Sequence, residues 1–255
     1  MTEHPSNELQ KSSSSYRIAI EDPSFLESRA QRGVRLMLEY EKAEEILKLW
    51  RINSTIVCYG SARVGEKGSD RHAQWYAAAR EFGRIVSVEG GAKFVLDGGL
   101  RENVIATGGG PGLMEAANRG AYDAGAPSIG FNITLPHEQE PNPYTTPELT
   151  FQFHYFSIRK MHLVMRAAAL VAFPGGFGTF DELFEVMTLR QTGKSRAIPI
   201  ILYDEDYWRS VVNFERIAEE GLISPQDLNI FQFASGPREA WEKIVAARKG
   251  TALDR

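Results

Sequence analysis

Pro174-Gly-Gly-Phe-Gly-Thr-Phe-Asp-Glu182 follows the apolar run 168–173 and opens a segment with helical periodicity. Apolar residues there recur at i, i+3, i+4 and i+7, at Phe180, Leu183, Phe184 and Met187. The order is therefore strand, glycine turn, helix. Glycines let backbone N–H groups approach an anion, and a helix start adds unpaired donors and a positive dipole end. With the Glu182 carboxylate nearby, the stretch predicts a phosphate cradle with an acid at its rim.

A purely structural interpretation of the same residues is open. Thr179 followed three residues later by Glu182 also fits a capping box, in which the glutamate only closes the start of the helix. The rest of the chain has to decide between the two.

Composition narrows the class of protein. The 255 residues are 43% hydrophobic and 24% charged, as expected for one large α/β domain with an appendage. A net charge of -4 gives no sign of a nucleic-acid surface. The single cysteine, Cys58, excludes an intramolecular disulfide and fits a reducing compartment. Without an apolar leader or membrane span, we expect a soluble cytoplasmic protein.

Two regions differ in pattern. Residues 1–15 are polar and serine-rich, which predicts a disordered tail, and residues 24–50 indicate one long helix or two shorter ones. We expect residues 1–50 to form this tail and helical extension, and residues 51–255 to form a nucleotide-binding catalytic domain.

In the second region short apolar strands alternate with helices. Strands are predicted at 55–60, 104–107, 128–133, 149–154, 170–173 and 198–203. Helices are predicted at 72–87, 113–124, 159–169, 180–191, 207–219 and 237–248. This alternation predicts an α/β fold, a Rossmann-like doubly wound parallel sheet with helices on both faces. Ligands in such folds bind outside the carboxyl ends of the strands.

Two more glycine turns belong to that edge of the sheet. Gly108-Gly-Gly-Pro-Gly112 follows one strand, and Gly60-Ser-Ala-Arg63 follows another. Tight strand-to-helix turns would also need glycines, so each has a structural alternative. No P-loop, nucleophile elbow or histidine pair with metal-ligand spacing is present, so the sequence predicts neither a metal nor a cofactor.

Arg159 and Lys160 stand together near the start of a predicted helix, where the dipole favours anions rather than cations. They are either a solvated surface pair or groups that meet a phosphate or an anionic transition state. Because their helix leads directly into the strand before Pro174, consecutive loops on one sheet edge can bring Arg159 toward Glu182.

Together these residues resemble the Lonely Guy family, long mislabelled as lysine decarboxylases. The nine-residue pattern P-G-G-x-G-T-x-x-E is intact, Arg159-Lys160 precedes it, and Gly108 to Glu115 is similar to the family's other glycine turn. The similarity covers about residues 54–246. The N-terminal extension and the segment 89–103 depart from the compact plant-type members, which leaves the precise substrate open.

The resemblance implies a homo-oligomeric nucleoside 5′-monophosphate phosphoribohydrolase without cofactor, acting on AMP or cytokinin riboside monophosphates. It implies Arg159 and Glu182 as catalytic residues. The implied substrate-binding residues are Glu138, Lys160, Gly109, Gly110, Gly175, Gly176, Phe177, Gly178, Thr179 and Thr188.

Three other interpretations compete with this one. The same turns would serve a carrier of molybdenum cofactor, although a carrier has no need of an acid beside the ribose. A pyridoxal-phosphate decarboxylase would need a lysine in a recognisable cofactor context, which neither Lys160 nor Lys194 has. A regulator that senses a nucleotide through the same site is the third.

Overall fold

The computed structural model of the chain describes residues 6–93, 99–135 and 140–250, and it divides into two compact units, Met1–Lys42 and Ala43–Arg255. The first unit contains short helices without a buried core of their own. These are α1 (Glu8–Ser12), η1 (Ser14–Tyr16), η2 (Ala19–Glu21), α2 (Pro23–Glu27) and η3 (Arg29–Gln31). Helical turns thus occur within the segment 1–15 that the sequence predicts to be disordered. Helix α3 (Arg32–Leu49) begins in this unit and ends in the second.

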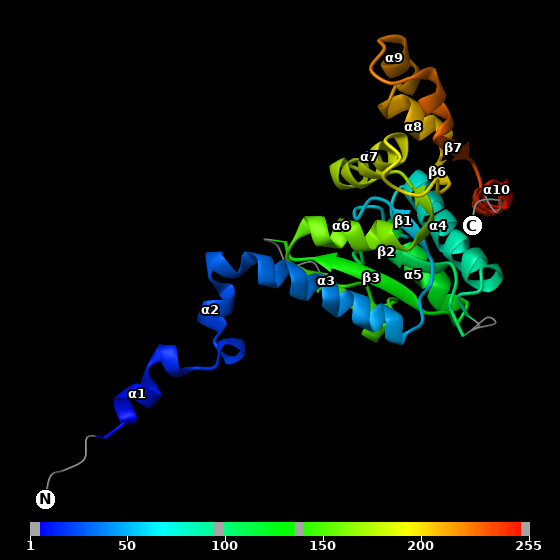
Figure 1. Cartoon of the computed structure of the whole chain (residues 1–255). Coiled ribbons are helices and arrows are strands. Elements are labelled where there is room, and N and C mark those ends of the chain that lie inside the picture. Colours follow the sequence, from blue (N-terminus) through cyan, green and yellow to red (C-terminus); the bar gives the residue numbers. More distant parts are fainter. Residues whose placement is uncertain (1–5, 94–98, 136–139, 251–255) are drawn as a thin grey trace, which may run out of the picture. The chain divides into compact units, whose positions relative to one another are not determined.

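The second unit is built on one sheet of seven parallel strands in the order β4-β3-β2-β1-β5-β6-β7 (Figure 1). The strands are β1 (Thr55–Tyr59), β2 (Val104–Thr107), β3 (Ser128–Ile133), β4 (Thr150–Phe153), β5 (Ala167–Ala172), β6 (Ile200–Tyr203) and β7 (Phe231–Ala234). The predicted Rossmann-like doubly wound parallel sheet is confirmed.

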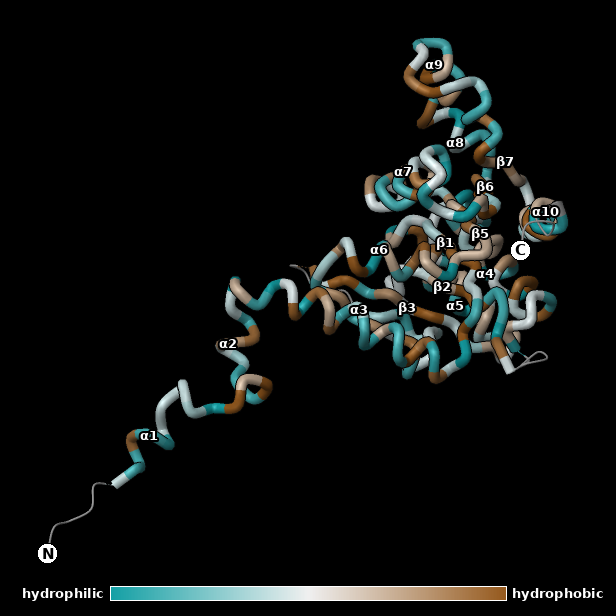
Figure 2. The backbone as a smooth tube through the Cα atoms, in the orientation of Figure 1, coloured by the Kyte–Doolittle hydropathy of each residue, from teal (hydrophilic) through white to brown (hydrophobic). Residues whose placement is uncertain are grey.

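Helices cover both faces of this sheet and bury two separate apolar clusters. One face carries α6 (Phe156–Met165), α7 (Phe177–Gln191), α8 (Glu205–Val211), α9 (Phe214–Glu219) and the end of α3. The other carries α4 (Asp70–Glu89), α5 (Leu113–Asp123) and α10 (Pro237–Gly250). Short 3-10 helices η4 (Pro147–Leu149) and η5 (Pro225–Asn229) complete the unit. In Figure 2 hydrophobic residues concentrate on the central strands. Among the described helices, none is both long enough and apolar enough to cross a bilayer.

Three element predictions need correction. The predicted helix 207–219 is two helices, α8 and α9, because the backbone is extended at Val212 and Asn213 caps the second helix. The predicted helix 159–169 ends at Met165, and Ala167–Ala172 is strand β5, which pairs with β1 and β6. Alanine favours helices in isolation, but here two neighbouring strands supply the backbone partners, and tertiary context overrides propensity. Strand β7 was missed. Its alternating burial, with one fully buried residue at Ala234, leaves a weak apolar pattern.

The chain reverses its direction of travel across the sheet between β4 and β5. Strands β1 to β4 run outward on one side of β1, whereas β5 to β7 run outward on the other side. Open α/β sheets bind ligands at such a switch point, outside the carboxyl ends of the two central strands. The turns after β1 and β5, which begin at Gly60 and Phe173, lie at this point.

Helices α4 and α5 pack closely because glycines face the partner helix. A Cβ on Gly83 would lie 2.2 Å from the carbonyl oxygen of Ala117, and one on Gly120 would lie 1.9 Å from the carbonyl oxygen of Arg80. Backbone atoms cannot move aside as a flexible side chain can. These two positions therefore set the distance of α5 from α4, and with it the position of the turn that precedes α5.

We predict that Gly120→Ala destabilises the protein by about 1–3 kcal/mol, because the added methyl group forces the two helices apart. The denaturant midpoint measures this loss. Gly33→Ala is the matched control, since nothing lies within 4 Å of a Cβ at that helical position. It should keep the wild-type midpoint or raise it slightly. A Gly120→Ala variant as stable as the wild type would contradict the close packing.

Candidate active site

Three glycine-bearing turns at the carboxyl edge of the sheet are joined to one another by backbone hydrogen bonds. The N–H of Ser61 donates to the carbonyl oxygen of Pro174 at 3.0 Å, and the N–H of Leu113 donates to that of Ser61 at 3.0 Å. Gly112 has φ +76°, and a Cβ there would lie 2.3 Å from the Ser61 carbonyl oxygen. Only glycine permits this approach. The turns after β1, β2 and β5 therefore form one connected floor.

A cavity of about 650 Å³ opens above this floor. Residues from the three turns, the end of β3 and the starts of α6 and α7 surround it. Its lining comprises Gly60, Ser61, Ala62, Arg63, Gly108, Met114, Asn132, Ile133, Leu135, Phe156, Arg159, Gly176, Phe177, Gly178, Thr179, Phe180 and Glu182.

Helix α7 presents its N-terminus to the cavity. The helix begins at Phe177, earlier than the predicted Phe180, and its N-cap residue Gly176 makes no side-chain cap. The first N–H groups of a helix have no intrahelical acceptor, so this end suits an anion. Phe177 is 97% exposed at the mouth of the cavity.

A hydrogen bond from α8 supports the turn before α7. The Tyr207 hydroxyl donates to the Gly175 carbonyl oxygen at 2.5 Å. A Cβ on Gly175 would lie 2.1 Å from Oγ1 of Thr179, so this glycine is needed for the turn to close. Gly175 supports the cavity from outside its lining, whereas Gly176, Gly178 and Thr179 line it.

The carboxylate of Glu182 is paired with Arg159 at the edge of the cavity. Arg159 Nη2 donates to Glu182 Oε1 at 2.7 Å, and Arg159 Nε donates to the carbonyl oxygen of Phe131 at 2.8 Å. The two residues are only 7% and 8% exposed. Because Thr179 lies inside the helix and Glu182 binds Arg159, the capping-box interpretation of Glu182 is wrong.

Burial raises the pKa of Glu182 above its ordinary value of 4.5. The Arg159 guanidinium acts in the opposite direction by stabilising the carboxylate, but it does not outweigh the loss of water. A carboxyl group with a raised pKa inside a cavity is a typical candidate for acid–base chemistry.

Lys160 turns away from the cavity. Its Nζ lies 3.2 Å from Asp181 Oδ1 and 3.1 Å from Glu185 Oε2. These ion pairs connect α6 with α7 outside the cavity lining. Burial lowers the pKa of Lys160, yet the two carboxylates outweigh this effect and raise it. The two adjacent basic residues thus differ: Arg159 meets the cavity, and Lys160 forms ion pairs with α7.

Besides Lys160 and Gly175, three more of the expected binding residues lie away from the cavity lining: Gly109, Gly110 and Thr188. Asn142, itself buried, donates through its side chain to the carbonyl oxygens of Gly109 and Gly110, which fixes the turn after β2. The Thr188 hydroxyl donates to the Phe184 carbonyl oxygen further along α7. Glu138 lies outside the described residues.

Sequence reasoning missed several side chains of the cavity, including Phe156 and Asn132. Phe156, the first residue of α6, and Asn132, near the end of β3, both line it. Asn132 is the one signal that the sequence offered, as an amide in an otherwise apolar strand end between Phe131 and Ile133.

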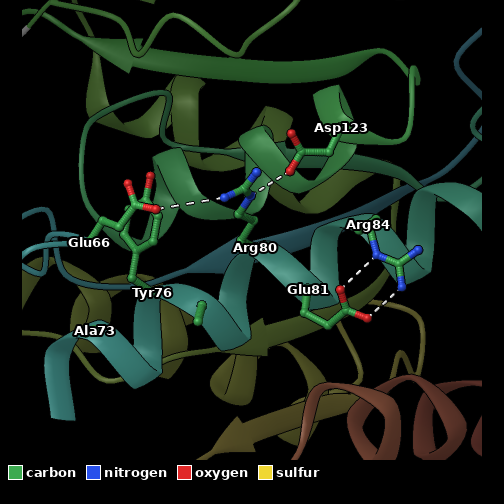
Figure 3. A pocket seen from close by; sticks show the side chains of 8 residues that line it. Glu66, Ala73, Tyr76, Arg80, Glu81, Arg84 and Asp123 are labelled. Atoms are coloured by element: carbon green, nitrogen blue, oxygen red, sulfur yellow. Dashed lines mark hydrogen bonds and ion pairs between the residues drawn. The ribbon is translucent and has the colours of Figure 1, made fainter. Parts of the chain in front are cut away.

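A second hollow, of about 310 Å³, lies on the outer side of α4 (Figure 3). Its charged side chains bind one another. Arg80 Nε lies 2.6 Å from Asp123 Oδ2, and Arg84 Nη2 lies 2.7 Å from Glu81 Oε1. Figure 3 shows Arg80 between Glu66 and Asp123. These paired, partly exposed groups make a solvated helix face, and the hollow offers no comparable chemistry.

Comparisons with known proteins show the family of this chain. Residues 114–244, just over half of the chain, match the family described as possible lysine decarboxylase. The chain is 30% identical over 142 residues to the probable cytokinin riboside 5′-monophosphate phosphoribohydrolase LOGL6 of Oryza sativa subsp. japonica, covering 54% of this chain and 56% of that protein. It is also 30% identical over 140 residues to cytokinin riboside 5′-monophosphate phosphoribohydrolase LOG1 of Arabidopsis thaliana, covering 54% and 64%. The chain thus spans less than two thirds of these relatives.

A solved structure shares the fold. The molybdenum cofactor binding protein of Rippkaea orientalis superposes with a TM-score of 0.52 at 22% identity, over 77% of this chain and 98% of that one. The family match begins at Met114 in α5 and includes both Arg159 and Glu182, and it confirms the resemblance seen in the sequence. The chain therefore belongs to the family described as possible lysine decarboxylase, and the curated relatives that it resembles carry LOG names.

Proposed function

We propose that this protein hydrolyses the N-glycosidic bond of a nucleoside 5′-monophosphate, either AMP or a cytokinin riboside monophosphate. The products are the free base and ribose 5-phosphate. The activities named for the rice and Arabidopsis relatives support this reaction class.

One observation carries the proposal: a buried arginine–glutamate pair and an uncapped helix N-terminus open onto the same cavity. The helix start with Gly176, Gly178 and Thr179 suits the 5′-phosphate. Glu182 lies on the second turn of that same helix, so a phosphate held at its start brings the ribose toward the carboxylate.

Breaking the bond between the anomeric carbon and the base leaves positive charge on the ribose ring. An ionised Glu182 stabilises this charge and accepts a proton from the attacking water. The water oxygen bonds to the anomeric carbon, and the bonding electron pair leaves with the base. The base gains one proton from solvent, and Glu182 returns to solvent the proton that it took from the water. Binding of the remote phosphate positions the ribose for this step.

Arg159 acts on the carboxylate and on the ligand. Its bonds to Glu182 and to the Phe131 carbonyl oxygen use two of the five guanidinium N–H groups, so others are available to a bound nucleotide. In this proposal Lys160 and Thr188 influence the site through α7, and Gly109, Gly110 and Gly175 shape its floor.

The proposal includes a homodimer or larger homo-oligomer in the cytoplasm. Exposed apolar side chains on α6, Phe156, Met161 and Met165, support association. The buried single cysteine Cys58 is compatible with a reducing compartment. The alternative of a nucleotide or molybdenum-cofactor carrier predicts binding without release of base.

The wild-type protein should release adenine and ribose 5-phosphate from AMP, and Glu182→Gln should lower kcat by about 100-fold or more. Chromatography of the free base measures both. Asp181→Asn is the matched control, because the neighbouring carboxylate is exposed and pairs with Lys160 outside the cavity. It should stay close to wild type. A fully active Glu182→Gln variant with an unchanged melting temperature would remove Glu182 from the mechanism.

Activity should fall on acidification with a midpoint above 4.5, the ordinary pKa of a glutamate. The reason is that Glu182 acts as the carboxylate, and burial raises its pKa, so it is protonated at a higher pH than an exposed glutamate. The pH dependence of kcat/KM, which reports the free enzyme, measures this midpoint. A midpoint at or below 4.5 would contradict the assignment.

A further inference from the structure

Asn132 has a buried amide whose hydrogen-bonding capacity the protein itself does not use. The residue is 8% exposed and lines the candidate cavity. Within the described residues, its Nδ2 is fully buried and has no hydrogen-bond partner. Buried polar atoms without partners are rare and costly, so each one calls for a physical reason. An amide kept in the cavity lining at this cost to stability is a candidate for a role in ligand binding.

Glycine neighbours hold this amide in place. A Cβ on Gly109 would lie 2.3 Å from Asn132 Nδ2 and 2.8 Å from its Oδ1. A Cβ on Gly130 would lie 3.4 Å from Nδ2. The amide therefore packs face-on against the glycine turn after β2. With Nδ2 buried, Oδ1 is the amide atom left to meet a ligand.

The amide lies beside the arginine–glutamate pair. Arg159 donates to the carbonyl oxygen of Phe131, the residue before Asn132. A Cβ on Gly108 would lie 2.7 Å from Nη2 of Arg159, whereas a Cβ on the next residue, Gly109, would meet Asn132. The guanidinium and the amide thus lie against consecutive residues of one turn.

The order of the strands indicates how a bound nucleotide would lie along the cavity. The phosphate-binding helix start follows β5, Arg159 covers the turn after β2, and Asn132 ends β3, in a sheet ordered β3-β2-β1-β5. Neighbouring strands lie about 4.8 Å apart, so roughly 14 Å separates the first place from the last. An extended nucleoside monophosphate with a hydrogen bond at each end spans a similar length. Its ribose then lies beside Glu182, and its base reaches Asn132.

We propose that Asn132 recognises the base, with Oδ1 accepting a hydrogen bond from an exocyclic amino group. This inference rests on the proposed function, because it takes the phosphate at α7 and the ribose at Glu182 as its frame. A 6-aminopurine offers this donor, and an N6-monosubstituted one retains an N–H. A 6-oxopurine places an acceptor at the same position and is rejected.

The test compares binding of AMP, inosine 5′-monophosphate and ribose 5-phosphate by calorimetry, in the Glu182→Gln background so that AMP is not consumed. Asn132→Leu should weaken AMP binding by about tenfold or more, leave ribose 5-phosphate binding unchanged, and remove the preference for AMP over inosine 5′-monophosphate. Asn132→Asp keeps an acceptor and should keep the preference. Thr134→Val is the control, since this exposed β3 neighbour bonds the Phe153 carbonyl oxygen outside the cavity lining.

Equal losses for all three ligands in Asn132→Leu would make Asn132 a structural residue and overturn the inference. An unchanged preference for AMP would overturn it as well. Ribose 5-phosphate binding shows that the variant site is folded, so a misfolded protein is recognised directly.

The outcomes separate this inference from the proposed function. If the wild-type protein prefers AMP through Asn132 but releases no adenine, the hydrolysis proposal fails and the base-recognition role stands. If it hydrolyses AMP and inosine 5′-monophosphate equally well, the role of Asn132 fails and the hydrolysis proposal stands. A wild-type protein that binds no nucleotide overturns both.

Discussion

The contact between the three strand-end turns is the constraint on which the cavity depends. Backbone hydrogen bonds connect Ser61 to both Pro174 and Leu113, and Gly112 leaves no room for a side chain at their meeting point. The parallel sheet brings these turns to one edge, and glycine lets them touch. The N-terminus of α7 and the start of α5 are therefore fixed relative to each other before any ligand arrives.

The burial of the Arg159–Glu182 ion pair is unfavourable in free energy, because both charges lose their contact with water. Apolar residues of similar volume would often be at least as stable there. The pair is nevertheless almost fully buried and faces a cavity. This arrangement indicates that the pair is retained for function rather than for stability. The raised pKa of Glu182 has the same origin, because burial disfavours the charged carboxylate.

Much of the fold could be predicted from the sequence, since β2 and β3 have the predicted bounds. The apolar run of β2 ends directly at Gly108, which marks the boundary of that strand. The start of β5 has no such marker, because Ala167–Ala169 favours a helix until neighbouring strands are known. The meeting of Arg159 with Glu182 followed from consecutive loops, and their catalytic roles stay predictions. The place of Asn132 in the site could not be predicted, because it results from packing against Gly109 in the turn after the neighbouring strand β2. The sequence of β3 alone does not show this contact.

Arg159, strand β5, the glycine turn and Glu182 all belong to one uninterrupted piece of chain, residues 156–182. In the proposed mechanism, ligand binding and chemistry are thus inherited together, yet they depend on different atoms: main-chain amides bind the phosphate, and two side chains carry out the reaction. Exchange of those two side chains during evolution would silence the reaction and spare ligand binding. One scaffold can in this way give rise to both catalysts and inert receptors without any change of topology.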